Sequence, residues 1–202
     1  MSLRQLTVAE TGVQAEKLRQ GPTALGFWIY LMTDLILFAS LFATYIVLLH
    51  GTYGGPSGKD IFDMPFVLAE TIILLTSSFV CGLTMIALRK ANKQLVLVGL
   101  GVTFALGAAF LALELYEFTN LVIDGHSWQA SAYLSAFFTL VGTHGAHIAV
   151  GLLWILVIVW QVFRRGFTKG VVRRLTSFSL FWHFLDLVWI FIFTIVYLMG
   201  VI

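Results

Sequence analysis

The stretch YLSAFFTLVGTHGAHIAVGLLWILVIVWQVF, residues 133–163, decides the fold class, because none of its 31 residues is Asp, Glu, Lys or Arg. An α-helix rises about 1.5 Å per residue and the hydrocarbon layer of a bilayer is about 30 Å thick, so about 20 apolar residues cross it. This stretch is long enough to cross a membrane as one helix that tilts or extends beyond the hydrocarbon.

Four similar stretches accompany it, so the sequence predicts an all-α, polytopic membrane protein built as a five-helix bundle. A tail of residues 1–26 would precede one transmembrane domain, residues 27–202. The connections are too short to bury a core of their own, so we expect no separate extramembrane domain. The predicted spans are residues 27–49, 66–88, 95–123, 133–163 and 175–200.

Composition excludes the soluble classes of protein. Hydrophobic residues make up 59% of the 202 residues, charged residues make up 11%, and the mean hydropathy is +0.95. A water-soluble enzyme, a disordered chain or a secreted scaffold needs more polar surface than this. The net charge of +2 does not indicate nucleic-acid binding, because the basic residues lie in short segments between the spans.

The distribution of Lys and Arg predicts the orientation in the membrane. All but one of the twelve lie in the tail and in the second and fourth connections, which share one side of a five-span chain. Positively charged segments remain in the cytoplasm, so the N-terminus is expected there and the C-terminus on the opposite, periplasmic side.

Small and aromatic residues predict how the spans are packed and anchored. Small residues recur every four positions in the third and fourth spans, which favours a close contact between these two helices. These residues are Gly101, Ala105 and Ala109 in the third span, and Gly142, Gly145, Ala146 and Ala149 in the fourth. Near the ends of the fourth and fifth spans, Tyr133 and Tyr197 are expected to lie at the lipid headgroups.

Eight ionisable residues fall inside the predicted spans, where water is absent. A central Asp opposes membrane insertion by about 2.5 to 3.5 kcal/mol, and no Lys or Arg lies within the spans as a partner. The acids must therefore remain protonated as hydrogen-bond donors, or pair with histidinium, hydroxyl or indole groups. The eight residues are Asp34, Glu70, Glu114, Glu117, His144, His147, His183 and Asp186.

Counting from the connections divides these residues into two groups at different depths. One group, Asp34, His183 and Asp186, lies in the cytoplasmic half of the membrane. The other lies at mid-depth or in the outer half and contains Glu70, Glu114, Glu117, His144 and His147. Residues three apart share a helix face, so Glu114 with Glu117, His144 with His147, and His183 with Asp186 are each expected to face the bundle.

Three interpretations of the polar groups are open. They can fix the packing of helices and partner subunits, form a path for protons or ions, or bind a metal. A metal site is disfavoured because the chain has no Glu-x-x-His pair, and histidines three apart on one helix cannot ligate both faces of a haem. His50 and His126 are expected to be solvated loop residues, and the sequence contains no recognisable catalytic motif.

Four segments resemble subunit III of the haem-copper terminal oxidases, most closely the form found in bo-type ubiquinol oxidases. Together they carry the resemblance along nearly the whole chain from Gly26 onward. They are GFWIYLMTD at residues 26–34, GGPSGKDIFDMPF at 54–66, GTHGAHI at 142–148 and FWHFLDLVWIFIFTIVYL at 181–198.

The resemblance implies a subunit of a proton-translocating quinol oxidase in a bacterial inner membrane, with no catalytic site, metal or cofactor of its own. Haem and copper would lie in subunit I, which this chain would stabilise and whose proton uptake it would support. Other oxidase subunits and membrane lipids are further expected partners. Two alternatives are a subunit III of a cytochrome c oxidase and a stand-alone proton-coupled carrier. Among the residues discussed above, the acids and histidines of the family map onto Glu70, Glu114, Glu117, His144, His147 and His183, with Asp186 following.

Overall fold

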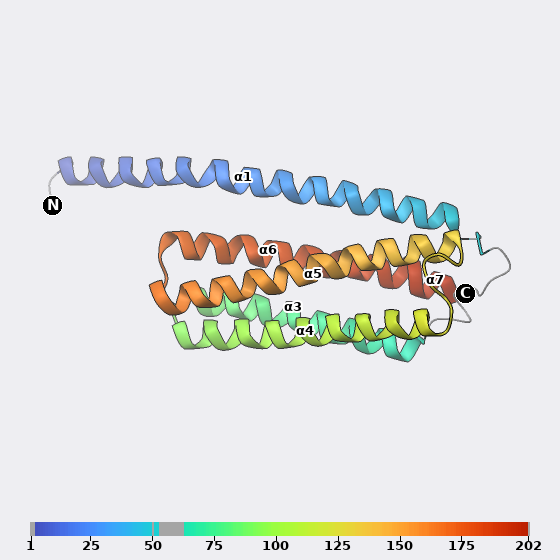
Figure 1. The fold of residues 1–202 in the computed structure, drawn as a ribbon. Coiled ribbons are helices and arrows are strands. Elements are labelled where there is room, and N and C mark those ends of the chain that lie inside the picture. The colour runs from blue at the N-terminus through green and yellow to red at the C-terminus, as the bar shows by residue number, and fades with distance from the viewer. Residues whose placement is uncertain (1–2, 50, 53–62, 202) are drawn as a thin grey trace. The chain divides into compact units, whose positions relative to one another are not determined.

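The computed structural model describes residues 3–49, 51–52 and 63–201, and within these ranges the regular structure is entirely helical (Figure 1). Five helical segments are long and apolar enough to cross a membrane, which confirms the predicted fold class. Their bounds are Leu25–Leu48, Met64–Arg89, Lys93–Ile123, Ala132–Arg165 and Lys169–Leu198. His50 and most of the segment GGPSGKDIFDMPF, residues 54–66, lie outside the described residues.

The helices extend somewhat beyond the predicted spans. Their bounds are α1 Leu3–Leu48, α3 Met64–Arg89, α4 Lys93–Ile123, α5 Ala132–Arg165, α6 Lys169–Ile192, the π-helix η1 Phe193–Leu198, and α7 Met199–Val201. The backbone is thus helical through most of the predicted tail as well as through the first span.

Side-chain caps explain where three of these helices begin. Asn92, Ser131 and Thr168 each accept a hydrogen bond from a backbone N–H three residues ahead, at the starts of α4, α5 and α6. The fifth span therefore begins as a helix at Lys169, whereas the sequence predicted a start at residue 175. Hydropathy locates the edge of the membrane, but a capped helix can begin in the polar segment before that edge.

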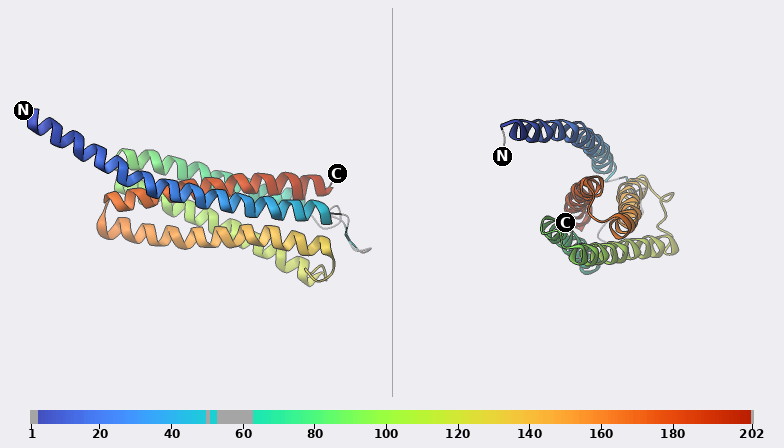
Figure 2. Two further views of the ribbon diagram at one scale, coloured as in Figure 1. Left: turned by 90° about the horizontal axis from the view of Figure 1, so that it is seen from above. Right: turned by 90° about the vertical axis from the view of Figure 1, so that its left-hand side faces the viewer.

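The chain divides into two compact units, Met1–Leu37 and Phe38–Ile202. The first unit contains the N-terminal part of α1. In the second unit, contacts join α3 to α4, α4 to α5, α5 to α6, and α6 back to α3, so these four helices close a ring. They lie side by side in Figure 1 and are neighbours in the end-on view of Figure 2.

The indole ring of Trp182 occupies the centre of this ring of helices. A Cβ atom added to Gly107 of α4 or to Gly151 of α5 would lie only 2.8 Å from that indole. The two glycines therefore leave room for the Trp182 indole, which an alanine at either position would displace. The indole N–H donates to Ser77 Oγ of α3 across 3.2 Å, which satisfies its one polar group.

The predicted contact between the third and fourth spans is confirmed, since α4 packs on α5. The residues expected to form the α4 side of that contact are wrong, because Gly101, Ala105 and Ala109 lie on the exposed side of α4. The buried face of α4 instead includes Gly107 and Glu114. Spacing by four identified a stripe of small residues, but a stripe does not reveal which way it faces.

Candidate functional site

Three glutamates from two helices meet in the second unit and form what we call the acid cluster: Glu70 of α3 with Glu114 and Glu117 of α4. They lie close enough for their charges to interact, and all three also interact electrostatically with Tyr197. Glu70 and Glu114 are almost completely shielded from solvent. The sequence prediction that these acids share one region is therefore confirmed.

Tyr197, in the C-terminal part of the chain, donates a hydrogen bond to the acid cluster. Its hydroxyl donates to Glu117 Oε2 across 2.9 Å. The prediction that Tyr197 anchors the chain at the lipid headgroups is wrong, because its side chain is completely buried. Tyr133 is also buried, against Tyr45, and is not an exposed anchor either. Both tyrosines lie near span ends, where hydropathy does not distinguish the inside of the bundle from its lipid-facing side.

Gly145 makes room for the carboxyl group of Glu114. A Cβ atom at Gly145 would lie 2.5 Å from Oε1 and 2.8 Å from Oε2 of that carboxyl group. Gly145, the second glycine of the GTHGAHI segment, thus borders the acid cluster, in addition to lying on the face where α5 meets α4. Both carboxyl oxygens of Glu70 and Oε2 of Glu114 have no hydrogen-bond partner among the described residues. An ionised carboxylate in this position would be costly, so the arrangement favours neutral acids.

The two histidines of the GTHGAHI segment share a helix face, as predicted, because both contact the ring of Phe38. His144 is completely buried between Trp189, at a centroid distance of 5.2 Å, and Phe110, at 6.0 Å. His147 Nδ1 lies 2.7 Å from the carbonyl oxygen of Thr143, one turn earlier on the same helix.

The hydrogen bonds that tie α6 to α3 were not predicted from the sequence. Trp189 donates its indole N–H to Thr71 Oγ1 across 3.1 Å, and Trp182 makes the similar bond to Ser77. Indole and hydroxyl groups were considered only as general partners for acids. A serine or threonine facing a buried tryptophan is the signal that could have revealed these bonds.

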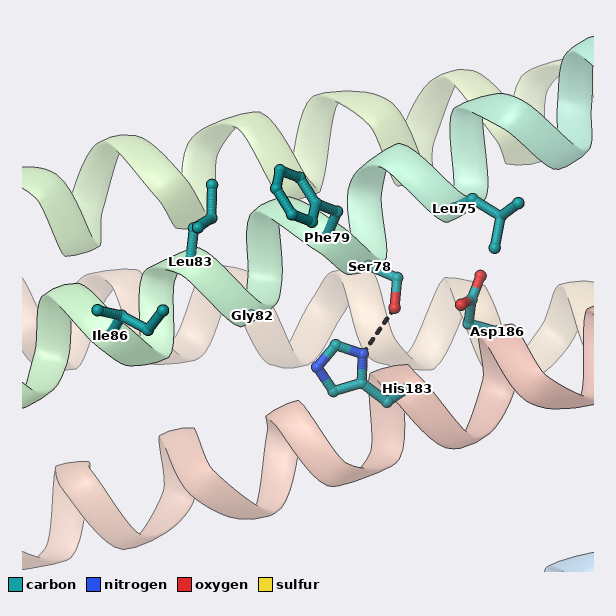
Figure 3. Close-up of a pocket in the computed structure, with 8 residues that line it drawn as sticks. All are labelled: Leu75, Ser78, Phe79, Gly82, Leu83, Ile86, His183 and Asp186. Carbon is teal, nitrogen blue, oxygen red and sulfur yellow. Dashed lines mark hydrogen bonds between the residues drawn. The ribbon is translucent and has the colours of Figure 1, made fainter.

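His183 and Asp186 lie on a second face, where α3 and α6 border an open groove of about 500 Å³ (Figure 3). His183 Nδ1 lies 2.6 Å from Ser78 Oγ, so an imidazole and a hydroxyl share a hydrogen bond across the two helices. The carboxyl group of Asp186 lies beside this pair in Figure 3. The prediction that His183 and Asp186 share a face is confirmed. Asp34 belongs to the first unit, so its grouping with these residues stays a prediction.

The described part of the chain contains no cluster of metal-ligating side chains. No group of three or more His, Cys, Asp or Glu residues is placed there so that it could hold a metal ion. His144 is enclosed by aromatic rings, and His147 is bonded to its own helix. The acids and histidines are instead distributed along contacts between helices.

Comparison with known proteins shows the family of the chain. Residues 6–201 match the family described as cytochrome c oxidase subunit III. Cytochrome bo(3) ubiquinol oxidase subunit 3 of Pseudomonas aeruginosa is 57% identical over 180 residues, which cover 89% of this chain and 86% of the relative. Cytochrome c oxidase subunit 3 of Bacillus sp. strain PS3 is 47% identical over 178 residues, which cover 88% and 86%.

Quinol oxidase subunit 3 of Bacillus subtilis is 44% identical over 176 residues, covering 87% of this chain and 86% of that protein. The family match extends through nearly all of the sequence, including all five helices that can cross a membrane. The chain therefore belongs to the cytochrome c oxidase subunit III family.

Proposed function

We propose that this chain is the non-catalytic third subunit of a proton-translocating haem-copper ubiquinol oxidase. In this proposal it lies in a bacterial inner membrane, packs against subunit I, stabilises that subunit and supports its proton uptake. Haem and copper belong to subunit I, and this chain binds neither. The complex as a whole oxidises quinol and reduces oxygen to water.

The observation that carries the proposal is that buried polar groups form hydrogen bonds from one helix to another. Tyr197 bonds to Glu117, Trp189 to Thr71, and Trp182 to Ser77, and each bond joins α6 or η1 to α3 or α4. Such bonds contribute about 0.6 to 2 kcal/mol each within a membrane and fix the register of the helices. This distribution supports a packing role over a reaction centre.

The relatives favour quinol over cytochrome c as the electron donor of the complex. The relatives from Pseudomonas aeruginosa and Pseudomonas putida, at 57% and 53% identity, are named ubiquinol oxidase subunits. A relative at 47% identity is named a cytochrome c oxidase subunit, so a cytochrome c oxidase remains the second candidate.

Purification from the native membrane in mild detergent tests the proposal. Affinity-tagged chain should recover a larger haem-containing subunit, and the product should consume oxygen with ubiquinol and not with reduced cytochrome c. The opposite donor preference would identify the second candidate. A colourless preparation containing only this chain would contradict the proposal and favour a stand-alone carrier.

Removal of the chain distinguishes a supporting role from a catalytic one. Oxidase purified from cells lacking this subunit should begin turnover at nearly the normal rate and then lose activity faster than the intact complex. Complete loss of the initial rate, with subunit I and its haem present in normal amounts, would contradict a non-catalytic role.

A further inference from the structure

We propose that the groove between α3 and α6 is the surface on which a transmembrane helix of another oxidase subunit docks through a hydroxyl or amide side chain at mid-membrane depth. This inference rests on the proposed function, because it requires that the chain assemble with other subunits. Beyond the proposed function, it names the face of the chain that contacts the partner and the kind of side chain that the partner contributes.

The groove combines an apolar border with a floor that a second helix can approach closely. Leu75, Phe79, Leu83 and Ile86 follow one face of α3 at helical spacing, and each side chain is exposed. Gly82 lies among them, and a Cβ atom there would have only His183 Cε1 within 4 Å, at 4.0 Å. Small residues flanked by apolar ones are typical of helix contacts in membranes.

Polar groups border this groove at a depth where lipid hydrocarbon provides no hydrogen-bond partner. His183 is exposed even though Ser78 holds its Nδ1 atom, so Nε2 is left for another partner. Asp186 also lines the groove, where its carboxyl group hydrogen-bonds with Ser78, while its Oδ1 atom is buried. An exposed histidine and a neighbouring carboxyl group at this depth would oppose insertion, which favours an occupant with hydrogen-bonding groups.

The position of the groove along the helices selects a protein partner over a lipid headgroup. Ser78 is separated from Arg89, the cation at the nearer end of α3, by about 16 Å of helix at 1.5 Å per residue. The other end of α3, at Met64, is farther still. Headgroups lie outside the hydrocarbon layer, so none reaches Ser78 and His183 without leaving the interface. A transmembrane helix can present a polar side chain at this depth.

The chemistry of the groove specifies the kind of side chain. Nε2 of His183 donates or accepts according to its tautomer, and the Asp186 carboxyl group accepts when ionised and can donate when protonated. A hydroxyl or a side-chain amide both donates and accepts, so it can bond to either group in either state. The 12 residues from Leu75 to Ile86 give this partner a contact of about three helical turns.

Two glycine substitutions provide a matched test. Gly82→Leu fills the groove without displacing the chain's own backbone, because Gly82 has open space beside it. Gly101→Leu is the control, since Gly101 is exposed on α4 and a Cβ atom there would have nothing within 4 Å. In tagged preparations from native membranes, Gly82→Leu should reduce the haem recovered per chain by about fivefold or more, as overpacking of a contact does. The control should retain the wild-type ratio.

A photo-crosslinking residue in place of Phe79, which is 67% exposed, identifies the occupant. The intact complex should give a crosslink to a transmembrane segment of another oxidase subunit, located by mass spectrometry. The same residue in place of Leu153, on an exposed face of α5, is the control. Crosslinks from position 79 only to lipid, quinone or a second copy of this chain would overturn the proposal, as would normal haem recovery with Gly82→Leu.

The outcome with wild-type chain separates a failure of the proposed function from a failure of the proposed docking face. If wild-type chain recovers no haem-containing subunit, the proposed function is wrong. If wild-type chain recovers that subunit but position 79 does not crosslink to a subunit and position 153 does, only the assignment of the docking face is wrong.

Discussion

A methyl group added at Gly145 tests whether the packing of α5 on α4 depends on space for the Glu114 carboxyl group. In Gly145→Ala, the new Cβ atom would meet Oε1 at 2.5 Å, Oε2 at 2.8 Å and Cδ at 2.9 Å. All three distances are shorter than side chains tolerate, and Glu114 is only 2% exposed, so its carboxyl group has little free space into which it can move. Overpacking of this kind costs about 1 to 3 kcal/mol, which is about a 5- to 150-fold loss in the folding equilibrium.

The free energy of unfolding of purified chain in detergent, measured by denaturant titration, checks this expectation. Gly101→Ala is the matched control, because Gly101 has nothing within 4 Å and should be neutral or gain up to about 1 kcal/mol from helix propensity. Adding Glu114→Ala to Gly145→Ala should recover part of the loss, since the two residues are in contact. The reasoning is refuted if Gly145→Ala is as stable as the control, or if the double variant shows no such coupling.

Three further substitutions or fusions extend the test. Tyr197→Phe removes the hydrogen bond to the acid cluster and should lower the free energy of unfolding by about 0.6 to 1.7 kcal/mol. Tyr116→Phe, on an exposed face, is the control and should not lower it. Equal effects of the two substitutions would show that the bond is unimportant. Leucine in place of Glu70, Glu114 or His147 should reduce assembly or sustained oxidase activity more than initial turnover, and an immediate loss of oxygen reduction would indicate direct chemistry. A periplasm-dependent reporter enzyme fused within residues 124–131 or at the C-terminus should be active, and activity there of a cytoplasm-dependent reporter would reverse the predicted orientation.

The sequence predicted the five spans because insertion depends mainly on length and hydropathy, and both can be read without knowledge of neighbouring helices. The ends of the helices were harder to predict from the sequence. Thr168 begins α6 in a polar segment that hydropathy excludes, so the span starts at Lys169 and not at residue 175. Local capping chemistry, and not membrane burial, determines that boundary.

The composition of the candidate site was also predictable, but its contacts were not. An acid inside a span is conspicuous, so Glu70, Glu114 and Glu117 were identified from the sequence alone, and counting residues from the connections placed them at a common depth. The direction of a helix face depends on tertiary packing. For that reason the exposed stripe containing Gly101 was interpreted as a contact, while Gly107, which does approach a neighbour closely, was not singled out.

The hydrogen bond of Tyr197 was not predicted for a more specific reason, which is the π-helix at the end of α6. Three aromatic donors on this segment, Trp182, Trp189 and Tyr197, bond to α3 or α4. The first two are seven residues apart, about two α-helical turns, so they share a face. Tyr197 follows after eight, a spacing that would rotate it away from that face in an uninterrupted α-helix. η1 spans Phe193–Leu198 and absorbs the additional residue, because a π turn contains one more residue than an α turn. The hydroxyl of Tyr197 is thereby returned to the side of α6 that faces the acid cluster, so a register based on 3.6 residues per turn could not have assigned this donor to Glu117.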